Sequence, residues 1–307
     1  MANVTDAAFR RMIAKYGKPD VIFTEFVSCH GLCSKGKEKL LQELIFHKSE
    51  RPIVAQIWGV NPEYFYKTAK MLKKMGFDGI DINMGCPEKN VEKMGSGAKL
   101  MQNPRLAKKI IEATKKGAGA LPVSVKTRLG YDKNNIEKWM KYLLEAGPDA
   151  IIIHARTRKE MSKVPAHWDM VAKAVKIAEK YNPKKDRPKI IGNGDVKSLA
   201  EAEENVKKYG VDGVMVGRGV FGNPWFFNKK IKYEDITPKE KIEVMLEHAR
   251  LFEKIFGKEK NFDTIKKHFK SYISGFSGAK NIRARLMKAK NLKETENIIK
   301  KITVIKK

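Results

Sequence analysis

The stretch Gly79-Ile80-Asp81-Ile82-Asn83-Met84-Gly85-Cys86-Pro87 decides the fold, because a short, largely apolar run stops at a polar turn that contains glycine and proline. A run of this kind predicts a strand buried on both faces, as in a parallel sheet. The same arrangement recurs along the chain, and longer amphipathic stretches separate the runs, which is typical of βα units. The predicted strands are residues 21–26, 53–58, 79–84, 123–127, 150–154, 189–192 and 213–216.

The helices predicted between these strands lead to a barrel. They cover residues 61–75, 104–116, 136–146 and 168–181, and a capping box at Ser198 opens another that closes at Gly210. A further helix, residues 6–16, precedes the first predicted strand. The pattern therefore predicts a TIM (β/α)8-type barrel, apparently lacking its first strand. An open doubly wound sheet is the alternative, although no Gly-x-Gly-x-x-Gly follows an early strand.

The pattern changes after Phe227, where we expect a second domain. Thr237-Pro238-Lys239-Glu240 combines an N-cap, a proline at the first helical position and a capping-box glutamate. Helices are predicted from there to Gly257 and over residues 262–273, 282–290 and 292–302. Residues 236–307 hold 19 Lys and Arg against 8 Asp and Glu. The predicted division is a catalytic barrel over 1–230 and a basic helical domain over 236–307.

Composition narrows the classes of function. The 307 residues carry a formal net charge of +28, with 42% hydrophobic residues. There is no apolar run of the roughly 18 residues that a membrane helix needs, and the N-terminus lacks the features of a secretory signal. Three cysteines are too few for a disulfide framework, so we expect a cytoplasmic protein. The positive charge favours nucleic acid as partner, the alternative being a uniformly lysine-rich surface. No obligatory protein partner is evident.

Polar groups recur at the ends of the predicted strands, where a barrel keeps its active site. Glycine-rich turns follow the last two strands, and such turns expose backbone N–H groups that cradle phosphate, with Arg218 adding a cation. The candidate side chains are Gln56, Asn83, Cys86, Lys126, Arg128, His154, Arg156, Asn193, Asp195 and Arg218, with Gly194 and Gly217 in the turns.

Three of these side chains have more than one interpretation. Lys126 has apolar neighbours, so its amine either faces an anion or acts in its neutral form. The alternative without a functional role is a lysine whose amine extends to solvent. Pro87 holds Cys86 in extended geometry, which aims the thiol, although a lone cysteine is often buried and inert. Gln56 suits hydrogen bonding to a planar heterocycle. Cys29 and Cys33 lack the pattern of a metal site and are interpreted as structural or loop thiols.

Taken together, these motifs resemble the tRNA-dihydrouridine synthase family over essentially the whole chain. The resemblance rests on Val4-Thr5-Asp6, Phe9-Arg10, Gln56, Asn83-Met84-Gly85-Cys86-Pro87, Gly97-Ala98, Val125-Lys126-Thr127-Arg128, His154-Ala155-Arg156-Thr157, Gly192-Asn193-Gly194-Asp195, Gly217-Arg218-Gly219 and Lys267-His268.

The resemblance implies an FMN-dependent barrel that uses NADPH to reduce the C5–C6 double bond of tRNA uridine. Cys86 then corresponds to the acid that protonates C5 after hydride reaches C6. Asn83, Arg128 and Arg156 are placed near the substrate. The residues implied to bind the cofactor are Met1, Gln56, Lys126, His154, Asn193, Gly194, Asp195, Gly217 and Arg218.

The substrate must leave its stack to reach such a site, so the base is expected to flip out while the basic helical domain holds tRNA phosphates. Arg283 and Arg285 are the candidate contacts there, the alternative being a solvated face. Two other functions stay open at this point. One is an FMN-dependent dehydrogenase of the dihydroorotate type, and the other is a catalytically inactive RNA-binding barrel.

Overall fold

The computed structural model describes residues 3–182, 186–257 and 259–305, and its sheet consists of seven parallel strands. The strands pair in the order in which they occur along the chain, from β1 to β7. In a doubly wound sheet the spatial order of the strands reverses at a switch point, where the chain returns to the middle of the sheet. The order β1 to β7 has no such reversal, which excludes that alternative for the described strands. The strands are β1 (Ile22–Ser28), β2 (Ile53–Trp58), β3 (Gly79–Asn83), β4 (Val123–Arg128), β5 (Ala150–His154), β6 (Lys189–Asn193) and β7 (Gly213–Met215).

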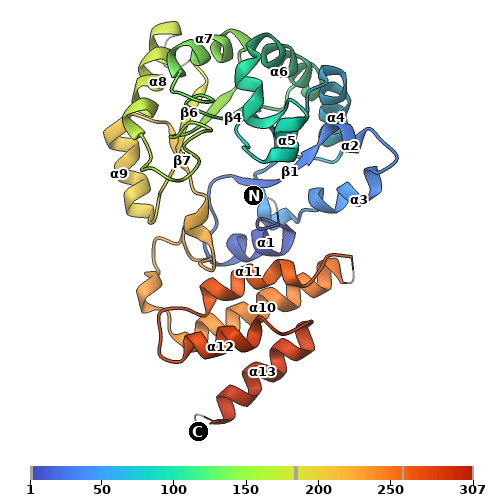
Figure 1. The fold of residues 1–307 in the computed structure, drawn as a ribbon, viewed down its shortest axis with the longest axis vertical. Helices are drawn as coiled ribbons and strands as arrows, with labels where there is room; N and C mark the ends of the chain where they lie inside the picture. The colour runs from blue at the N-terminus through green and yellow to red at the C-terminus, as the bar shows by residue number, and fades with distance from the viewer. Residues whose placement is uncertain (1–2, 183–185, 258, 306–307) are drawn as a thin grey trace. The chain divides into compact units, whose positions relative to one another are not determined.

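All seven predicted strands are confirmed, and their boundaries shift by two residues or fewer. All five residues of β3 are buried, as expected of a strand covered on both faces. At β1 the strand continues to Ser28 because the pairing with β2 resumes after an irregularity between Phe23 and Phe26. Figure 1 shows the long helices arranged around the outside of this sheet. They are α4 (Pro62–Lys74), α6 (Pro104–Ala118), α7 (Ile136–Ala146), α8 (Trp168–Tyr181) and α9 (Leu199–Tyr209).

Local capping explains where these helices begin. Asn61 and Asn103 accept hydrogen bonds from the first turns of α4 and α6, and a proline opens both helices. Shorter elements lie in the connections. They are α2 (Cys29–Leu32), α3 (Lys37–Leu41), η1 (Gln42–Leu44), η2 (Lys48–Glu50), α5 (Lys89–Lys93), η3 (Gly97–Gln102), η4 (Arg218–Val220) and η5 (Tyr233–Asp235).

The chain separates into two compact units. One, the barrel unit, comprises residues 21–45 and 51–219, and the other, the helical unit, comprises residues 1–20, 46–50 and 220–307. The helical unit contains α1 (Ala7–Tyr16), α10 (Pro238–Phe256), α11 (Asp263–Tyr272), α12 (Ala279–Leu286) and α13 (Leu292–Ile305). The capping box predicted at Thr237 and Glu240 is present at the start of α10. Helix α12 begins three residues before its prediction, directly after Gly278 in the left-handed region.

These units differ from the predicted division because α1 packs with the C-terminal helices. Ala7, Ala8 and Met12 belong to the same apolar core as Phe252 and Phe269. The Arg10 guanidinium donates to the carboxylate of Glu50 at 2.6 Å, and both side chains are buried. Residues 1–20, 46–50 and 220–230 therefore belong to the helical unit, although the sequence assigned them to the barrel.

Within the described residues, no helix is long and apolar enough to cross a membrane.

Candidate active site at the carboxyl ends of the strands

The parallel register aligns the polar residues of neighbouring strands. Gln56 pairs with Asp81, Asn83 with Lys126, and His154 with Asn193. Because parallel strands end at the same edge of the sheet, this register gathers the predicted amide, amine and imidazole at one edge.

The turn that carries Cys86 is held by the side chain of Asn83. Its Oδ1 accepts hydrogen bonds from the backbone N–H groups of Gly85, at 3.1 Å, and of Cys86, at 2.9 Å. Its Nδ2 donates to Gln56 Oε1 at 3.0 Å. Gly97 approaches this turn so closely that a Cβ there would lie 2.6 Å from the Cys86 carbonyl oxygen, and its φ is positive. The thiol is therefore held at a defined place after β3.

Cys86 is a free and partly exposed cysteine. Burial raises the pKa of its thiol above the ordinary value, so the group stays protonated at neutral pH. Cys29 is buried and Cys33 is exposed, and both are free thiols. In the described part of the chain no group of three or more His, Cys, Asp or Glu could hold a metal ion.

Lys126 is the cation at the centre of the site. Its Nζ donates to Asn193 Oδ1 at 3.2 Å, and Asn193 Nδ2 donates to the Met215 carbonyl oxygen at 2.8 Å. Burial, and then the nearby Arg128, lower the pKa of Lys126 to about 8. In the segments that the structure describes, no carboxylate lies within ion-pair distance of this amine. Such a cation fits a ligand that carries negative charge.

His154 is surrounded by positive groups. Burial, and then the charges of Lys126, Arg128, Arg156 and Arg218, lower the pKa of His154 to about 2. The ring is therefore neutral across the physiological range. Arg156 Nη1 lies 3.2 Å from His154 Nε2, and because a guanidinium only donates, Nε2 must accept and the ring proton lies on Nδ1.

The two glycine-containing turns meet at Asp195. This carboxylate accepts from Arg218 Nη2 at 3.1 Å and from Arg156 Nη2. The Arg218 side chain is 62% exposed and can turn toward a ligand. Gly194 has a φ of +142° and Gly217 has open space where a side chain would stand. A backbone without side chains beside an exposed cation is suited to phosphate.

Comparison with known proteins decides the family. The model of the family described as dihydrouridine synthase (Dus) matches residues 1–307. The chain belongs to this family. It is 41% identical to a probable tRNA-dihydrouridine synthase from Staphylococcus aureus (strain COL) over 302 residues, covering 97% of this chain and 90% of that protein. It is 39% identical to probable tRNA-dihydrouridine synthase 2 from Bacillus subtilis (strain 168), over 97% of this chain and 91% of that one.

Solved structures support the barrel. Morphinone reductase matches with a TM-score of 0.54 and 11% identity, over 74% of this chain and 81% of its own. Histamine dehydrogenase from Rhizobium sp. 4-9 matches with a TM-score of 0.53 and 14% identity, over 80% of this chain and 46% of its own. At such identities the match concerns the fold, and it confirms the predicted TIM (β/α)8-type class for this dihydrouridine synthase family member.

The two arginines of the barrel unit that were predicted near the substrate, Arg128 and Arg156, make hydrogen bonds within the protein. Arg156 is 2% exposed, and it donates to Val164 O at 2.6 Å as well as to His154 and Asp195. Arg128 is 7% exposed and joins two loops by donating to the carbonyl oxygens of Gly85 and Thr157. Both guanidinium groups are occupied within the protein, so the geometry favours support of the site over contact with substrate. Met1, predicted to bind the cofactor, lies outside the described residues.

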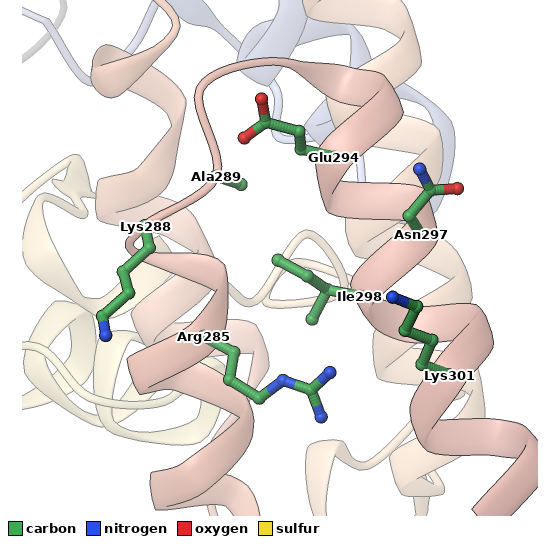
Figure 2. A pocket seen from close by; sticks show the side chains of 7 residues that line it. All are labelled: Arg285, Lys288, Ala289, Glu294, Asn297, Ile298 and Lys301. Atoms are coloured by element: carbon green, nitrogen blue, oxygen red, sulfur yellow. The ribbon is translucent and has the colours of Figure 1, made fainter.

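The two arginines predicted on the helical unit also differ from each other. Arg283 Nη1 donates to the Ile273 carbonyl oxygen at 2.7 Å and so ties α12 to the end of α11. Arg285 lines a hollow of about 280 Å³ between α12 and α13, together with Lys288, Ala289, Glu294, Asn297, Ile298 and Lys301. In Figure 2 the side chains of Arg285 and Lys301 extend toward the space between the two helices. Three cationic side chains, those of Arg285, Lys288 and Lys301, line this hollow against the single carboxylate of Glu294, so positive groups dominate it.

Sequence reasoning overlooked one residue of the barrel site. Asp81 is fully buried in β3, where it accepts hydrogen bonds from Ser124 and Gln56. A carboxylate in the middle of an otherwise apolar strand was the available signal, since buried acids are rare unless they are hydrogen-bonded.

Proposed function

We propose that this chain is a tRNA-dihydrouridine synthase that reduces the C5–C6 double bond of uridine in tRNA, with FMN at the strand ends and NADPH as reductant. The observation that supports this proposal best is a cysteine thiol held at a barrel strand end, in a chain that matches the dihydrouridine synthase family along its whole length.

Cys86 is the proposed proton donor to C5 of the base. A thiol with a raised pKa holds its proton at neutral pH, and the Asn83 hydrogen bonds keep the thiol-bearing turn in place. Asn83 is also the proposed neighbour of the uracil ring. After the transfer, the thiolate lies near Arg128, whose charge lowers the pKa of this thiol and so stabilises the anion.

The residues at the strand ends fit FMN. Lys126, a cation without a carboxylate partner in the described residues, provides positive charge. Gln56 uses its oxygen and one N–H within the protein, and neutral His154 uses Nε2. The second N–H of the Gln56 amide and the Nδ1–H of His154 are the proposed donors to a heterocycle or its side chain. Arg218, with the backbone of Asn193, Gly194, Asp195 and Gly217, is the proposed phosphate site. When bound and reduced, FMN supplies hydride for the reduction of the double bond.

The helical unit is the proposed holder of the tRNA body. A base within a stacked helix cannot reach a site at the barrel mouth, so the uridine must be flipped out while phosphates are held elsewhere. Residues 236–307 carry a formal charge of +11. Arg285, Lys288 and Lys301 around the hollow are the proposed phosphate contacts, and none is ion-paired among the described residues.

Anaerobic reoxidation of the reduced, FMN-loaded protein tests this function. Unmodified tRNA should restore the absorbance of oxidised flavin, whereas orotate, the unsaturated pyrimidine acid that a dihydroorotate-type enzyme would reduce, should not react. Reaction with a free pyrimidine acid but not with tRNA would contradict the proposal and favour a small-molecule dehydrogenase. A protein that binds tRNA but no flavin would be the inactive RNA-binding barrel.

A further inference from the structure

A row of hydrogen-bonded side chains crosses β2, β3 and β4. Gln56, Asp81 and Ser124 are register partners on three adjacent strands. Asp81 Oδ1 accepts from Ser124 Oγ at 2.6 Å, and Asp81 Oδ2 accepts from Gln56 Nε2 at 2.7 Å. Asp81 is 0% exposed. Both of its oxygens therefore have a protein donor in place of water.

This row continues to the Cys86 turn. Gln56 Oε1 accepts from Asn83 Nδ2, and Asn83 Oδ1 accepts from the N–H groups of Gly85 and Cys86. We define the side chains of Asp81, Gln56 and Asn83 as the Asp81 network. Every hydrogen bond in it runs in one direction, from the turn through the two amides to the carboxylate.

The direction matters because an amide side chain can rotate its oxygen and nitrogen into each other's places. A carboxylate only accepts, so it requires the nitrogen of Gln56 on its side and leaves the oxygen for Asn83. Asn83 must then present its nitrogen to Gln56 and its oxygen to the turn. Reversing either amide would set two donors or two acceptors against each other, and a buried unmatched polar group is costly.

We propose that Asp81 is a positioning residue that acts through Gln56 and Asn83 to hold the Gly85–Cys86 turn, and with it the Cys86 thiol, in its reactive place. The catalytic importance of this positioning role rests on the proposed function of Cys86 as proton donor. The hydrogen-bond network itself does not depend on that function, so the two can fail separately.

Amide hydrogen exchange at Gly85 and Cys86 in the full chain without FMN tests the proposal directly. Asp81→Ala leaves Gln56 free to rotate, so exchange at both amides should accelerate about tenfold, the equivalent of one lost buried hydrogen bond. Asn83→Ala removes the acceptor itself and gives the maximum effect. Ser124→Ala removes a partly buried hydrogen bond to Asp81 that lies outside the network, and it should leave both amides protected.

Asp81→Asn separates hydrogen-bond direction from charge. Its oxygen can still accept from Gln56 while its nitrogen donates to Ser124, so exchange at the turn should stay slow. If Asp81→Asn accelerates exchange as much as Asp81→Ala, the charge is what matters and the proposal is wrong. If Asp81→Ala does not fold, Gln56→Met removes the middle link at similar volume and should give the same acceleration.

The thiol provides a second readout. In Asp81→Ala a loosened turn should raise the rate of Cys86 alkylation by iodoacetamide, as followed by peptide mass spectrometry. Exposed Cys33 in the same molecule is the internal reference, because it lies outside the network. Slow exchange and an unchanged Cys86-to-Cys33 ratio in a folded Asp81→Ala protein would overturn the proposal. Loosened exchange in Asp81→Ala, together with a parent protein that never reduces tRNA, would instead refute the proposed function alone.

Discussion

Lys126 and Asn193 share a hydrogen bond of 3.2 Å although β5 lies between their strands, β4 and β6. Where a sheet curves, the side chains on its concave side converge, so residues from strands that are not neighbours can meet there. This curvature brings residues separated by 67 positions into one site. The same amine has a pKa lowered to about 8 by burial, so its charge is adjustable near physiological pH.

The affinity for FMN should therefore depend on the charge of Lys126. Below pH 8 the amine is a cation, and as the pH rises through about 8 it loses its proton and its attraction for an anionic ligand. Binding of reduced FMN should weaken between pH 7 and 9.5, as measured by flavin fluorescence or absorbance titration. Lys126→Arg keeps its charge and should flatten the profile. Parallel profiles for the two proteins would exclude Lys126 as the cause.

Arg218→Ala should lower FMN occupancy at limiting FMN. The loss of one exposed, charge-assisted contact to phosphate predicts about a tenfold weaker affinity, measured by equilibrium dialysis. Lys189→Ala is the matched control. Lys189 also carries a positive charge, but it lies at the first residue of β6, at the end of the strand away from the Asn193 turn. Equal losses in both variants would indicate a general effect of charge and no phosphate site at Arg218.

The salt dependence of tRNA binding should identify the cations of the helical unit. Replacing Arg285, Lys288 and Lys301 with glutamine should reduce the slope of log K against log salt by up to about 0.7–0.9 per lost phosphate contact. Arg283→Gln should leave that slope unchanged. It should instead lower the free energy of unfolding by about 1–2 kcal/mol, because it removes the hydrogen bond to Ile273 O. Binding isotherms at several salt concentrations measure the slope for each variant. A slope unaffected by the triple substitution would exclude the hollow as a binding site for tRNA phosphates.

His248 should make the helical unit sensitive to acid. The ring is 0% exposed beside His268 and Tyr272, and burial, followed by the charge of His268, holds its pKa well below 6.5. The unfolded chain binds a proton as the pH falls below about 6.5 whereas the folded protein does not, so stability decreases with falling pH.

Replacing this ring tests the assignment. His248→Phe should flatten the acid decline by up to about 1.4 kcal/mol per pH unit in urea unfolding between pH 7 and 5. His30→Gln changes an exposed imidazole and is the control. If both variants follow the parent's pH dependence, other groups cause the acid sensitivity.

Local sequence patterns were sufficient to predict the strands and most of the helices. The run from Gly79 to Asn83 and the capping box at Thr237 each depend on neighbours in sequence, so their structure could be predicted from the residues alone. The residues at the strand ends were also predictable, because parallel strands place their ends together. Which of these side chains contact a ligand was not predictable.

The missed features depend on contacts between distant residues. Helix α1 looks like any amphipathic helix, and only its packing against the core of Phe252 and Phe269 assigns it to the helical unit. Arg156 and Arg283 look like available cations, yet each is engaged with groups that the sequence does not place beside it. Periodicity reports which face of an element is buried but not which partner buries it.

Mass spectrometry of tRNA tests the central claim most directly. The full-length protein, loaded with FMN and given NADPH and unmodified tRNA, should add the mass of two hydrogen atoms to at least one uridine. The Cys86→Ala protein should still bind flavin and oxidise NADPH. It should form almost none of this product, because the thiol of Cys86 is the proposed donor of the proton to C5. A Cys86→Ala protein that forms dihydrouridine at the parent's rate would contradict the role of the thiol. A flavin-loaded, NADPH-reducible parent that leaves every uridine unchanged would contradict the account itself.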